Sequence, residues 1–156
     1  MKTITIVGLF LSILVLPLSA RTEAPAPPGI PQGVTTEEVR QFMDEYKARM
    51  VKMDLDGFMD LFSKEVVENR VRPYGDMREA YQRTFSNSQS LGYELEIYSI
   101  QTYEKTALVR GRYELTQFLG GKKIERRVFS GDIQWDLVRE DRSLKIKGVN
   151  YGRDLR

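Results

Sequence analysis

The sequence contains neither cysteine nor histidine. Without cysteine, the chain cannot form disulfides, thiol nucleophiles or zinc-thiolate sites. Without histidine, it lacks Ser-His and Cys-His nucleophile pairs and the usual general base near neutral pH. Any catalysis would have to use Asp, Glu, Tyr, Lys or Arg. We therefore expect no metal and no cofactor.

An excess of one charge is also lacking, because 24 basic residues stand against 22 acidic ones and the net charge is +2. No long basic run occurs, so we expect no nucleic-acid partner. An apolar run long enough for a membrane-crossing helix is missing as well. The run from Ile4 to Leu16 is shorter than the about 20 apolar residues that a membrane-crossing helix needs.

The first twenty residues have the layout of a secretory signal peptide. Lys2 precedes the apolar run, and the segment ends in the small residues Ser19 and Ala20. We expect cleavage near Ala20 and a secreted or periplasmic protein without a stable membrane span. The alternative is an uncleaved N-terminal anchor. A lipoprotein anchor is excluded, because no cysteine follows the run.

Proline is concentrated just after this segment, at Pro25, Pro27, Pro28 and Pro31. Proline at this density favours neither helix nor sheet. The sequence therefore predicts a signal peptide over 1–20, an extended linker over 21–34 and one folded domain over 35–156.

Helices are predicted in the first half of this domain. Thr35 and Glu38 form a capping box, and apolar residues at spacings of three and four continue to Met53. Asp54 or Asp56 can then cap a shorter second helix. A third helix is predicted from Asp76 to about Ser86.

The stretch ENRVRPYG, residues 68–75, lies between the second and third predicted helices. We predict a turn at 63–65, a short strand over 66–71 and a break at Pro73-Tyr74-Gly75. Side chains alternate along a strand, so Glu68, Arg70 and Arg72 would share one face. These arginines could hold an anionic ligand, because a guanidinium suits carboxylates and phosphates. Alternatively, they lie on a solvated edge.

The second half of the domain alternates apolar and polar residues in four long strands, after a polar loop over 87–90. Turns are predicted at Glu104-Lys105, Gly120-Gly121 and 140–142. Glycines within the strands can permit bends. The order predicts an α+β fold in which three N-terminal helices pack in the concave face of a strongly curved antiparallel sheet, with a charged outer face that is either wet or paired in a homodimer.

This pattern resembles the nuclear transport factor 2-like superfamily, of the SnoaL-like and ketosteroid-isomerase-like kind. The resemblance covers roughly residues 35–153 and is carried by the stretches DLDGFMDLFSKEVV (54–67) and GDIQWDLVREDRSLKIKGVNYG (131–152). It implies a cone-shaped fold with a pocket. In the isomerases it implies a tyrosine donor on the first helix, which Tyr46 matches, and a carboxylate base near the end of the first strand. The matching region reads Arg70-Val71-Arg72, and Glu68 is the nearby carboxylate.

The candidate catalytic residues are therefore Tyr46 and Glu68. The candidate ligand-binding residues are Tyr46, Phe62, Arg70, Arg72, Tyr81, Phe85 and Trp135. The alternative is that the aromatic residues are core side chains, which overlaps with the first interpretation because core residues build pocket walls.

Three functions remain open at this point. The leading one is non-catalytic binding of a small apolar or anionic molecule, or of a protein. The second is an isomerase or dehydratase that uses a pocket tyrosine and a carboxylate. The third is a structural dimerisation module with a filled core.

Overall fold

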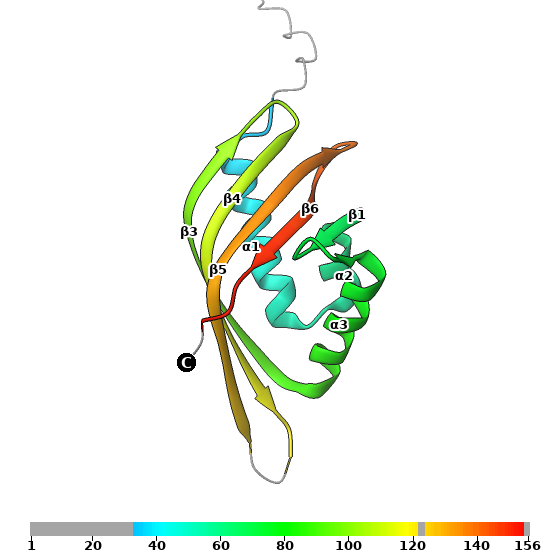
Figure 1. Ribbon diagram of the computed structural model, residues 1–156, viewed down its shortest axis with the longest axis vertical. Coiled ribbons are helices and arrows are strands. Elements are labelled where there is room, and N and C mark those ends of the chain that lie inside the picture. Colours follow the sequence, from blue (N-terminus) through cyan, green and yellow to red (C-terminus); the bar gives the residue numbers. More distant parts are fainter. Residues whose placement is uncertain (1–32, 122–123, 155–156) are drawn as a thin grey trace, which may run out of the picture. The chain divides into compact units, whose positions relative to one another are not determined.

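One curved sheet and three helices account for nearly all of the computed structural model, which describes residues 33–121 and 124–154 (Figure 1). The helices are α1 (Thr36–Lys52), α2 (Leu55–Asp60) and α3 (Tyr74–Asn87). The strands are β1 (Phe62–Glu68), β2 (Arg72–Pro73), β3 (Ser88–Thr102), β4 (Thr106–Leu119), β5 (Glu125–Glu140) and β6 (Ser143–Tyr151). The α+β class is confirmed. The expected signal peptide and residues 21–32 of the expected linker lie outside the described residues.

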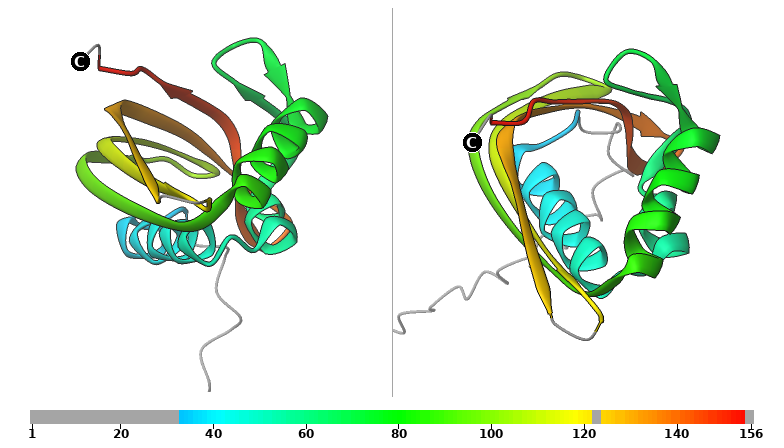
Figure 2. Two further views of the ribbon diagram at one scale, coloured as in Figure 1. Left: turned by 90° about the horizontal axis from the view of Figure 1, so that it is seen from below. Right: turned by 60° about the horizontal axis from the view of Figure 1, so that its bottom comes forward.

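The sheet has the strand order β2-β1-β6-β5-β4-β3. Strands β3 to β6 pair antiparallel, as predicted, whereas β1 runs parallel to β6 and so makes the sheet mixed. The sheet curls around α1, and α2 and α3 stand across its open side (Figure 2). Among the described residues, no helix has both the length and the apolar composition of a membrane crossing.

Residues at the N-terminus of α1 determine where this helix begins. Thr35 accepts a hydrogen bond from the Glu38 N–H at 3.2 Å, and the Thr35 backbone hydrogen-bonds the Glu38 carboxylate in return, so the predicted capping box is confirmed. The Glu38 carboxylate also binds both terminal nitrogens of Arg139 on β5, at 2.7 and 2.6 Å. This bidentate pair ties the start of the helix to the sheet. Val34, which was assigned to the linker, is buried and its N–H donates to the Tyr103 carbonyl at 3.2 Å.

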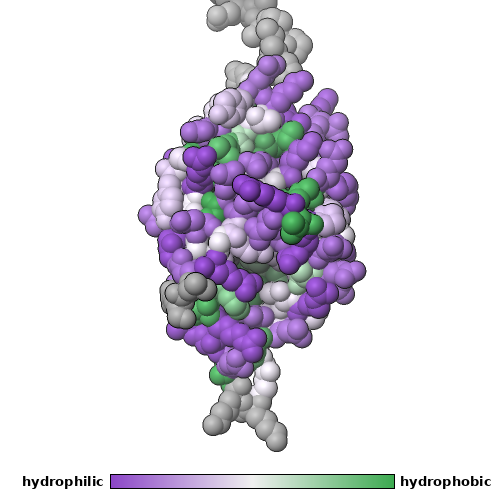
Figure 3. All heavy atoms as spheres, in the orientation of Figure 1, coloured by the Kyte–Doolittle hydropathy of each residue, from purple (hydrophilic) through white to green (hydrophobic). Residues whose placement is uncertain are grey.

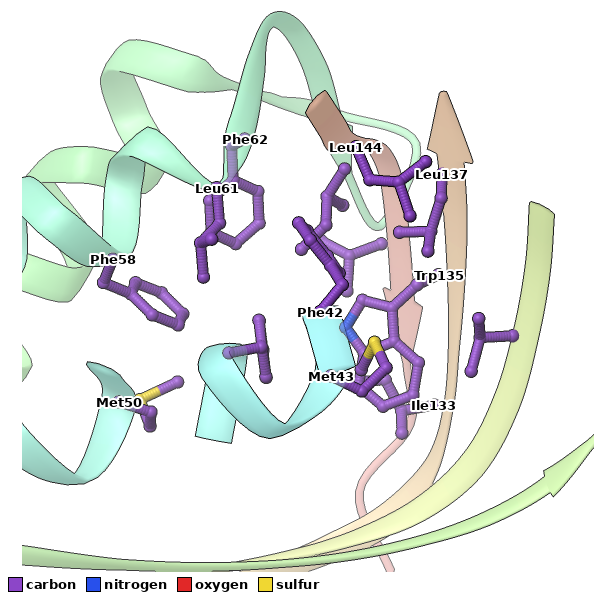
Figure 4. Packing of buried hydrophobic residues seen from close by; sticks show 14 of the residues in the cluster. Phe42, Met43, Met50, Phe58, Leu61, Phe62, Ile133, Trp135, Leu137 and Leu144 are labelled. Atoms are coloured by element: carbon purple, nitrogen blue, oxygen red, sulfur yellow. The ribbon is translucent and has the colours of Figure 1, made fainter. Parts of the chain in front are cut away.

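The core lies between α1 and the concave face of the sheet. Phe42 and Met43 of α1 lie against Ile133 and Trp135 of β5 (Figure 4). Trp135 is fully buried. The apolar stripe predicted for this helix is confirmed, because Val39, Phe42, Met43, Tyr46 and Met50 are all buried.

The predicted boundaries around β1 were wrong. Residues 63–65 are strand and not a turn, because β1 already pairs with β6 from Phe62 onward. The strand ends at Glu68, since Asn69 and Arg70 adopt left-handed φ values of 49° and 64°. This tight turn reverses the chain, so Arg70 does not share the face of Glu68 and Arg72.

The predicted break at 73–75 and the predicted loop at 87–90 were also wrong. Pro73 is the N-cap residue of α3, where its missing N–H costs no hydrogen bond, and Tyr74 and Gly75 are helical. Helix α3 continues directly into β3, because Ser88 already pairs with Leu119 of β4. Both polar stretches are therefore parts of regular elements.

Candidate functional site

A cavity of about 740 Å³ opens between α1, α3 and the concave face of the sheet. Its apolar wall is formed by Met50, Leu115, Leu119, Phe129 and Ile133. Its phenolic groups come from Tyr46, Tyr81, Tyr93, Tyr113 and Tyr151. Its charged side chains are Glu68, Arg72, Arg83, Arg127 and Arg153. A concave site of this volume, with apolar and polar side chains together in its wall, is typical of small-molecule sites.

These side chains point into the cavity because of the regular spacing of residues along helices and strands. Tyr46 and Met50 are one helical turn apart on α1, so both face the sheet. Tyr113 and Leu115 are two residues apart on β4, and Arg127 and Phe129 are two apart on β5, so each pair points to the concave face. The cavity thus draws side chains from both helical and strand faces that cover the core.

Glu68 is the buried carboxylate of the site, with 1% of its surface exposed. One of its oxygens, Oε2, forms an ion pair with Arg72. The other, Oε1, accepts hydrogen bonds from the hydroxyls of Tyr151 at 3.1 Å and Tyr81 at 3.4 Å. A buried carboxylate needs such partners to offset its lost hydration.

The turn between β1 and β2 creates this ion pair. Because Asn69 and Arg70 reverse the chain tightly, Arg72 on β2 stands directly opposite Glu68 on β1. Asn69 also fixes the turn to β6, since its N–H donates to the Val149 carbonyl at 2.8 Å and its Oδ1 accepts from the Tyr151 N–H at 2.9 Å. The same contacts hold Tyr151 next to Glu68.

Burial keeps the phenols of the cavity protonated. It raises the pKa of Tyr46, Tyr81 and Tyr93 well above the ordinary value, and in each case the charge of a neighbouring group adds to the effect. Burial, together with the charge of Glu68, raises the pKa of Tyr151 to about 12. These hydroxyls are therefore neutral hydrogen-bond donors and acceptors at physiological pH.

Trp135 lies behind Tyr46 at the base of the site. The two rings meet edge to face, with centroids 5.7 Å apart. Burial raises the pKa of the Tyr46 phenol, and the nearby indole N–H offsets a smaller part of this increase. Within the described part of the chain, this N–H makes no hydrogen bond of ordinary geometry. Trp135 thus orients Tyr46 but does not itself line the cavity.

The other three arginines of the site lie on more exposed parts of the lining. Arg83 forms a loose i,i+4 pair with Glu79 at 3.6 Å, and both side chains are largely exposed. Arg127 pairs through its Nε with Glu125 at 2.7 Å. The guanidinium of Arg153 stands over the Phe129 ring, 5.0 Å from its centroid, in a cation–π contact.

The structure brings together four of the residues that the sequence singled out: Tyr46, Glu68, Arg72 and Tyr81 all line the cavity. Phe62, Phe85 and Trp135 are core residues instead. Arg70 lies in a separate, shallow groove on the other side of the sheet, next to Tyr98 and Arg110. Glu68 is the last residue of the first strand.

Sequence reasoning missed several residues of the site, including Tyr93, Tyr113, Tyr151 and Arg153. A signal for Tyr93 and Tyr113 lies in the alternation of apolar and polar residues along their strands, which places both on the apolar face, where phenols are candidates for a pocket wall. No pattern predicted Tyr151 and Arg153, because their positions depend on how the chain continues after β6.

On the outer face of the sheet, Arg112 forms ion pairs with Asp154 and, at 3.6 Å, with Asp132 on the neighbouring strand. Asp136 accepts a hydrogen bond from Gln134 on its own strand at 3.3 Å. Among the described residues, no group of three carboxylates is close enough to hold a metal ion.

Solved structures share this architecture. A candidate scytalone dehydratase from Novosphingobium aromaticivorans matches with a TM-score of 0.69 and 12% identity, over 76% of this chain and 83% of that one. A candidate dehydratase of the nuclear transport factor 2-like family from Streptomyces avermitilis gives 0.66 and 12%, over 77% and 96%. A ketosteroid isomerase-like protein from Erwinia carotovora gives 0.63 and 16%, over 77% and 96%.

At these identities, the likeness shows the fold. The chain has the nuclear transport factor 2-like cone fold, and the resemblance seen in the sequence is confirmed at that level. No family model matches the sequence, and no curated protein is significantly similar to it.

Proposed function

We propose that this protein binds a small amphipathic organic molecule in the cone cavity. The observation that carries the proposal is a cavity of about 740 Å³ with an apolar wall and five phenolic side chains. A cavity of this size suits a ligand of the size of a metabolite or drug. A structural dimerisation module with a filled core is less well supported, because its interior would have no need of such a space.

The pairing of Glu68 favours binding over catalysis. A carboxylate has about four acceptor positions, and three of those of Glu68 are occupied by Arg72, Tyr81 and Tyr151. The other titratable groups of the lining are neutral phenols and arginines, which hydrogen-bond a ligand without exchanging protons with it near neutral pH. The site is thus equipped mainly for recognition.

Native mass spectrometry of the protein, purified gently from its natural source, tests the proposal. We expect a reproducible extra mass from a retained small molecule. Tyr46→Phe and Arg72→Ala should reduce its occupancy, whereas Tyr98→Phe, which changes an exposed phenol outside the cavity, should not. If no extra mass is found and no apolar probe binds to the purified protein, the proposal fails.

A proton-transfer enzyme of the isomerase or dehydratase type is the second candidate. It is favoured by the position of Glu68 at the end of β1, with the Tyr151 hydroxyl 3.1 Å from its carboxylate. Glu68 would take a proton from the bound molecule, and a neutral phenol would stabilise the negative charge that develops. Dehydratase-like and isomerase-like names among the structural neighbours agree with this candidate.

Glu68→Gln separates the two candidates. The variant keeps the size of the side chain but cannot act as a base, so an enzyme would lose turnover and still bind its substrate. For a binding protein, no substrate turns over in either form, and the variant changes affinity alone. The measurement is parallel assay of binding and of product formation on whichever molecule the native protein retains.

Export through the N-terminal segment is a separate proposal. If the segment is cleaved near Ala20, the intact mass of the exported protein will match a chain that starts at Arg21. Ala20→Phe should block cleavage and leave the longer chain, whereas Arg21→Lys should not. A full-length mass for the exported wild type would favour the retained anchor.

A further inference from the structure

Three of the four arginines of the cavity have no balancing carboxylate in its lining. Among the described residues that line it, four are arginines and one, Glu68, is acidic. Glu68 and Arg72 neutralise each other inside the site. Arg83, Arg127 and Arg153 remain, and the acidic partners of the first two, Glu79 and Glu125, do not line the cavity. The lining thus has an excess of arginines over carboxylates, which favours a negative ligand.

Along the concave face of strand β5, the side chains change from charged to apolar. Arg127, Phe129 and Ile133 all point to the concave side, and they change from exposed through half-buried to buried. Gln117, opposite Arg127 on β4, adds a polar amide at the same level. A ligand that matches this wall has a charged group at the Arg127 end and an apolar body further in.

The chain after β6 is fixed so that Arg153 joins this wall. The Gly152 N–H donates to the Asp132 carbonyl at 3.0 Å, and the Asp154 N–H donates to the Ser130 carbonyl at 2.8 Å. These two bonds hold Arg153 against β5, while the Asp154 carboxylate pairs with Arg112. Gly131 permits the close approach, because a Cβ there would lie 2.8 Å from the Gly152 carbonyl carbon.

We propose that the ligand of the cavity is an organic anion with an apolar body, whose carboxylate, sulfonate or phosphate is bound by Arg127 and Arg153. This inference rests on the proposed binding function and specifies its ligand class. The body lies along Phe129 and Ile133, and the phenol of Tyr46 donates to a polar atom at the inner end. The phenol of Tyr151 donates to Glu68, so its oxygen accepts from the ligand. The guanidinium forks supply the paired donors that such anions accept.

Two fluorescent probes with one skeleton test the inference. 1-Anilinonaphthalene-8-sulfonate carries an anionic group, whereas N-phenyl-1-naphthylamine lacks it, and both brighten in apolar surroundings. For the wild type, we expect one mutually competitive site and roughly tenfold tighter binding of the sulfonate, since a charge-assisted hydrogen bond is worth at least the energy of a tenfold change.

The variants locate the source of the preference. The double variant Arg127→Gln, Arg153→Gln should bind both probes equally. Arg126→Gln is the matched control, because Arg126 neighbours Arg127 but does not line the cavity. It should keep the wild-type preference. Circular dichroism and an unchanged unfolding midpoint establish that each variant is folded. A change in probe fluorescence then cannot come from binding of the sulfonate probe to a partly unfolded core.

The outcomes separate this inference from the proposed function. If neither probe binds the folded wild type, both are overturned. If the two probes bind equally well, the anion inference is overturned and the proposed binding function stands. If the double variant keeps the preference, Arg127 and Arg153 do not form the anion site, and the inference is overturned while the binding function again stands.

Discussion

Glu68 and the groups around it set the chemistry of the site at the scale of single residues. The carboxylate is buried, whereas its partner Arg72 is half exposed, so the pair spans the boundary between cavity and solvent. Tyr81 and Tyr151 complete the carboxylate's hydrogen bonds. Removing the charge would leave Arg72 without its counter-ion at a place where water compensates only in part.

Glu68→Gln should therefore lower the free energy of unfolding by about 2 kcal/mol, the order found for buried charge-assisted hydrogen bonds. Glu65→Gln is the matched control on the same strand, because the Glu65 side chain is 75% exposed and pairs with Lys147. It should cause no measurable change. Urea unfolding followed by circular dichroism gives both values, and equal effects of the two variants would contradict the role of Glu68.

Tyr151 makes the free energy of unfolding depend on pH in the alkaline range. Its pKa rises to about 12 in the folded protein, whereas an unfolded tyrosine titrates near about 10. Below pH 10 both states hold the proton, so stability is unaffected. Between about 10 and 12 the folded state binds more protons than the unfolded state, so the free energy of unfolding falls as the pH rises.

Tyr151→Phe should make this decline shallower, by up to about 1.4 kcal/mol per pH unit. Tyr98→Phe removes an exposed phenol and should leave the wild-type slope unchanged. The measurement is urea unfolding at a series of pH values from 8 upward. Parallel slopes for the wild type and Tyr151→Phe would mean that the phenol titrates normally in the folded protein.

At the scale of elements, the turn between β1 and β2 determines how Glu68 and Arg72 lie relative to each other. It aligns Arg72 with Glu68, yet Asn69 and Arg70 carry left-handed φ values that suit glycine or asparagine. Asn69 offsets its cost through two hydrogen bonds to β6. Arg70 is exposed, and its conformation is set by the turn alone.

Arg70→Gly should raise the free energy of unfolding by about 0.5–1 kcal/mol, because glycine adopts this conformation without strain. Val71→Gly is the control, since Val71 is 81% exposed and does not have a positive φ. It should lower stability through the greater freedom of the unfolded chain. If both variants destabilise the protein alike, the turn is not strained at Arg70.

The same turn shows how far sequence reasoning could reach. The helices and the long strands were predictable, because their spacing and caps are local properties of the chain. The end of β1 was not, since it depends on pairing with β6 and on a left-handed turn without glycine. The sequence therefore could not show that Glu68 is the last residue of the strand. Arg153 was missed because backbone bonds to β5 place it.

Curvature of the sheet creates the cavity at the scale of the whole folded unit. The register of β3 and β4 shifts between Ile97 and Ser99, next to Gly111, and the register of β5 and β6 shifts at Asp136, opposite Gly148. Both register shifts thus lie beside glycines within long strands, where a bend is permitted. The face seen in Figure 3 is mostly hydrophilic, with small separate hydrophobic groups. Pairing of two copies through the outer sheet face stays a prediction.

Gly111→Ala tests whether the bend at this glycine is required. A Cβ at Gly111 would overlap the carbonyl oxygen of Glu96 and lie 3.2 Å from its carbonyl carbon, and β3 would have to move away. We expect a loss of about 1–3 kcal/mol in the free energy of unfolding. Because the bend shapes the concave wall, binding of N-phenyl-1-naphthylamine should also weaken.

Gly92→Ala is the matched control on β3. There the nearest side-chain atom, the Thr116 Cβ, would be 3.7 Å away, which is ordinary contact. Alanine should leave stability unchanged or raise it by up to about 1 kcal/mol, because it restricts the unfolded chain. Urea unfolding and probe titration of both variants give the comparison. If Gly111→Ala is as stable as Gly92→Ala and binds the probe as the wild type does, the sheet can bend without this glycine, and the shape of the cavity is set by the helices packed within it.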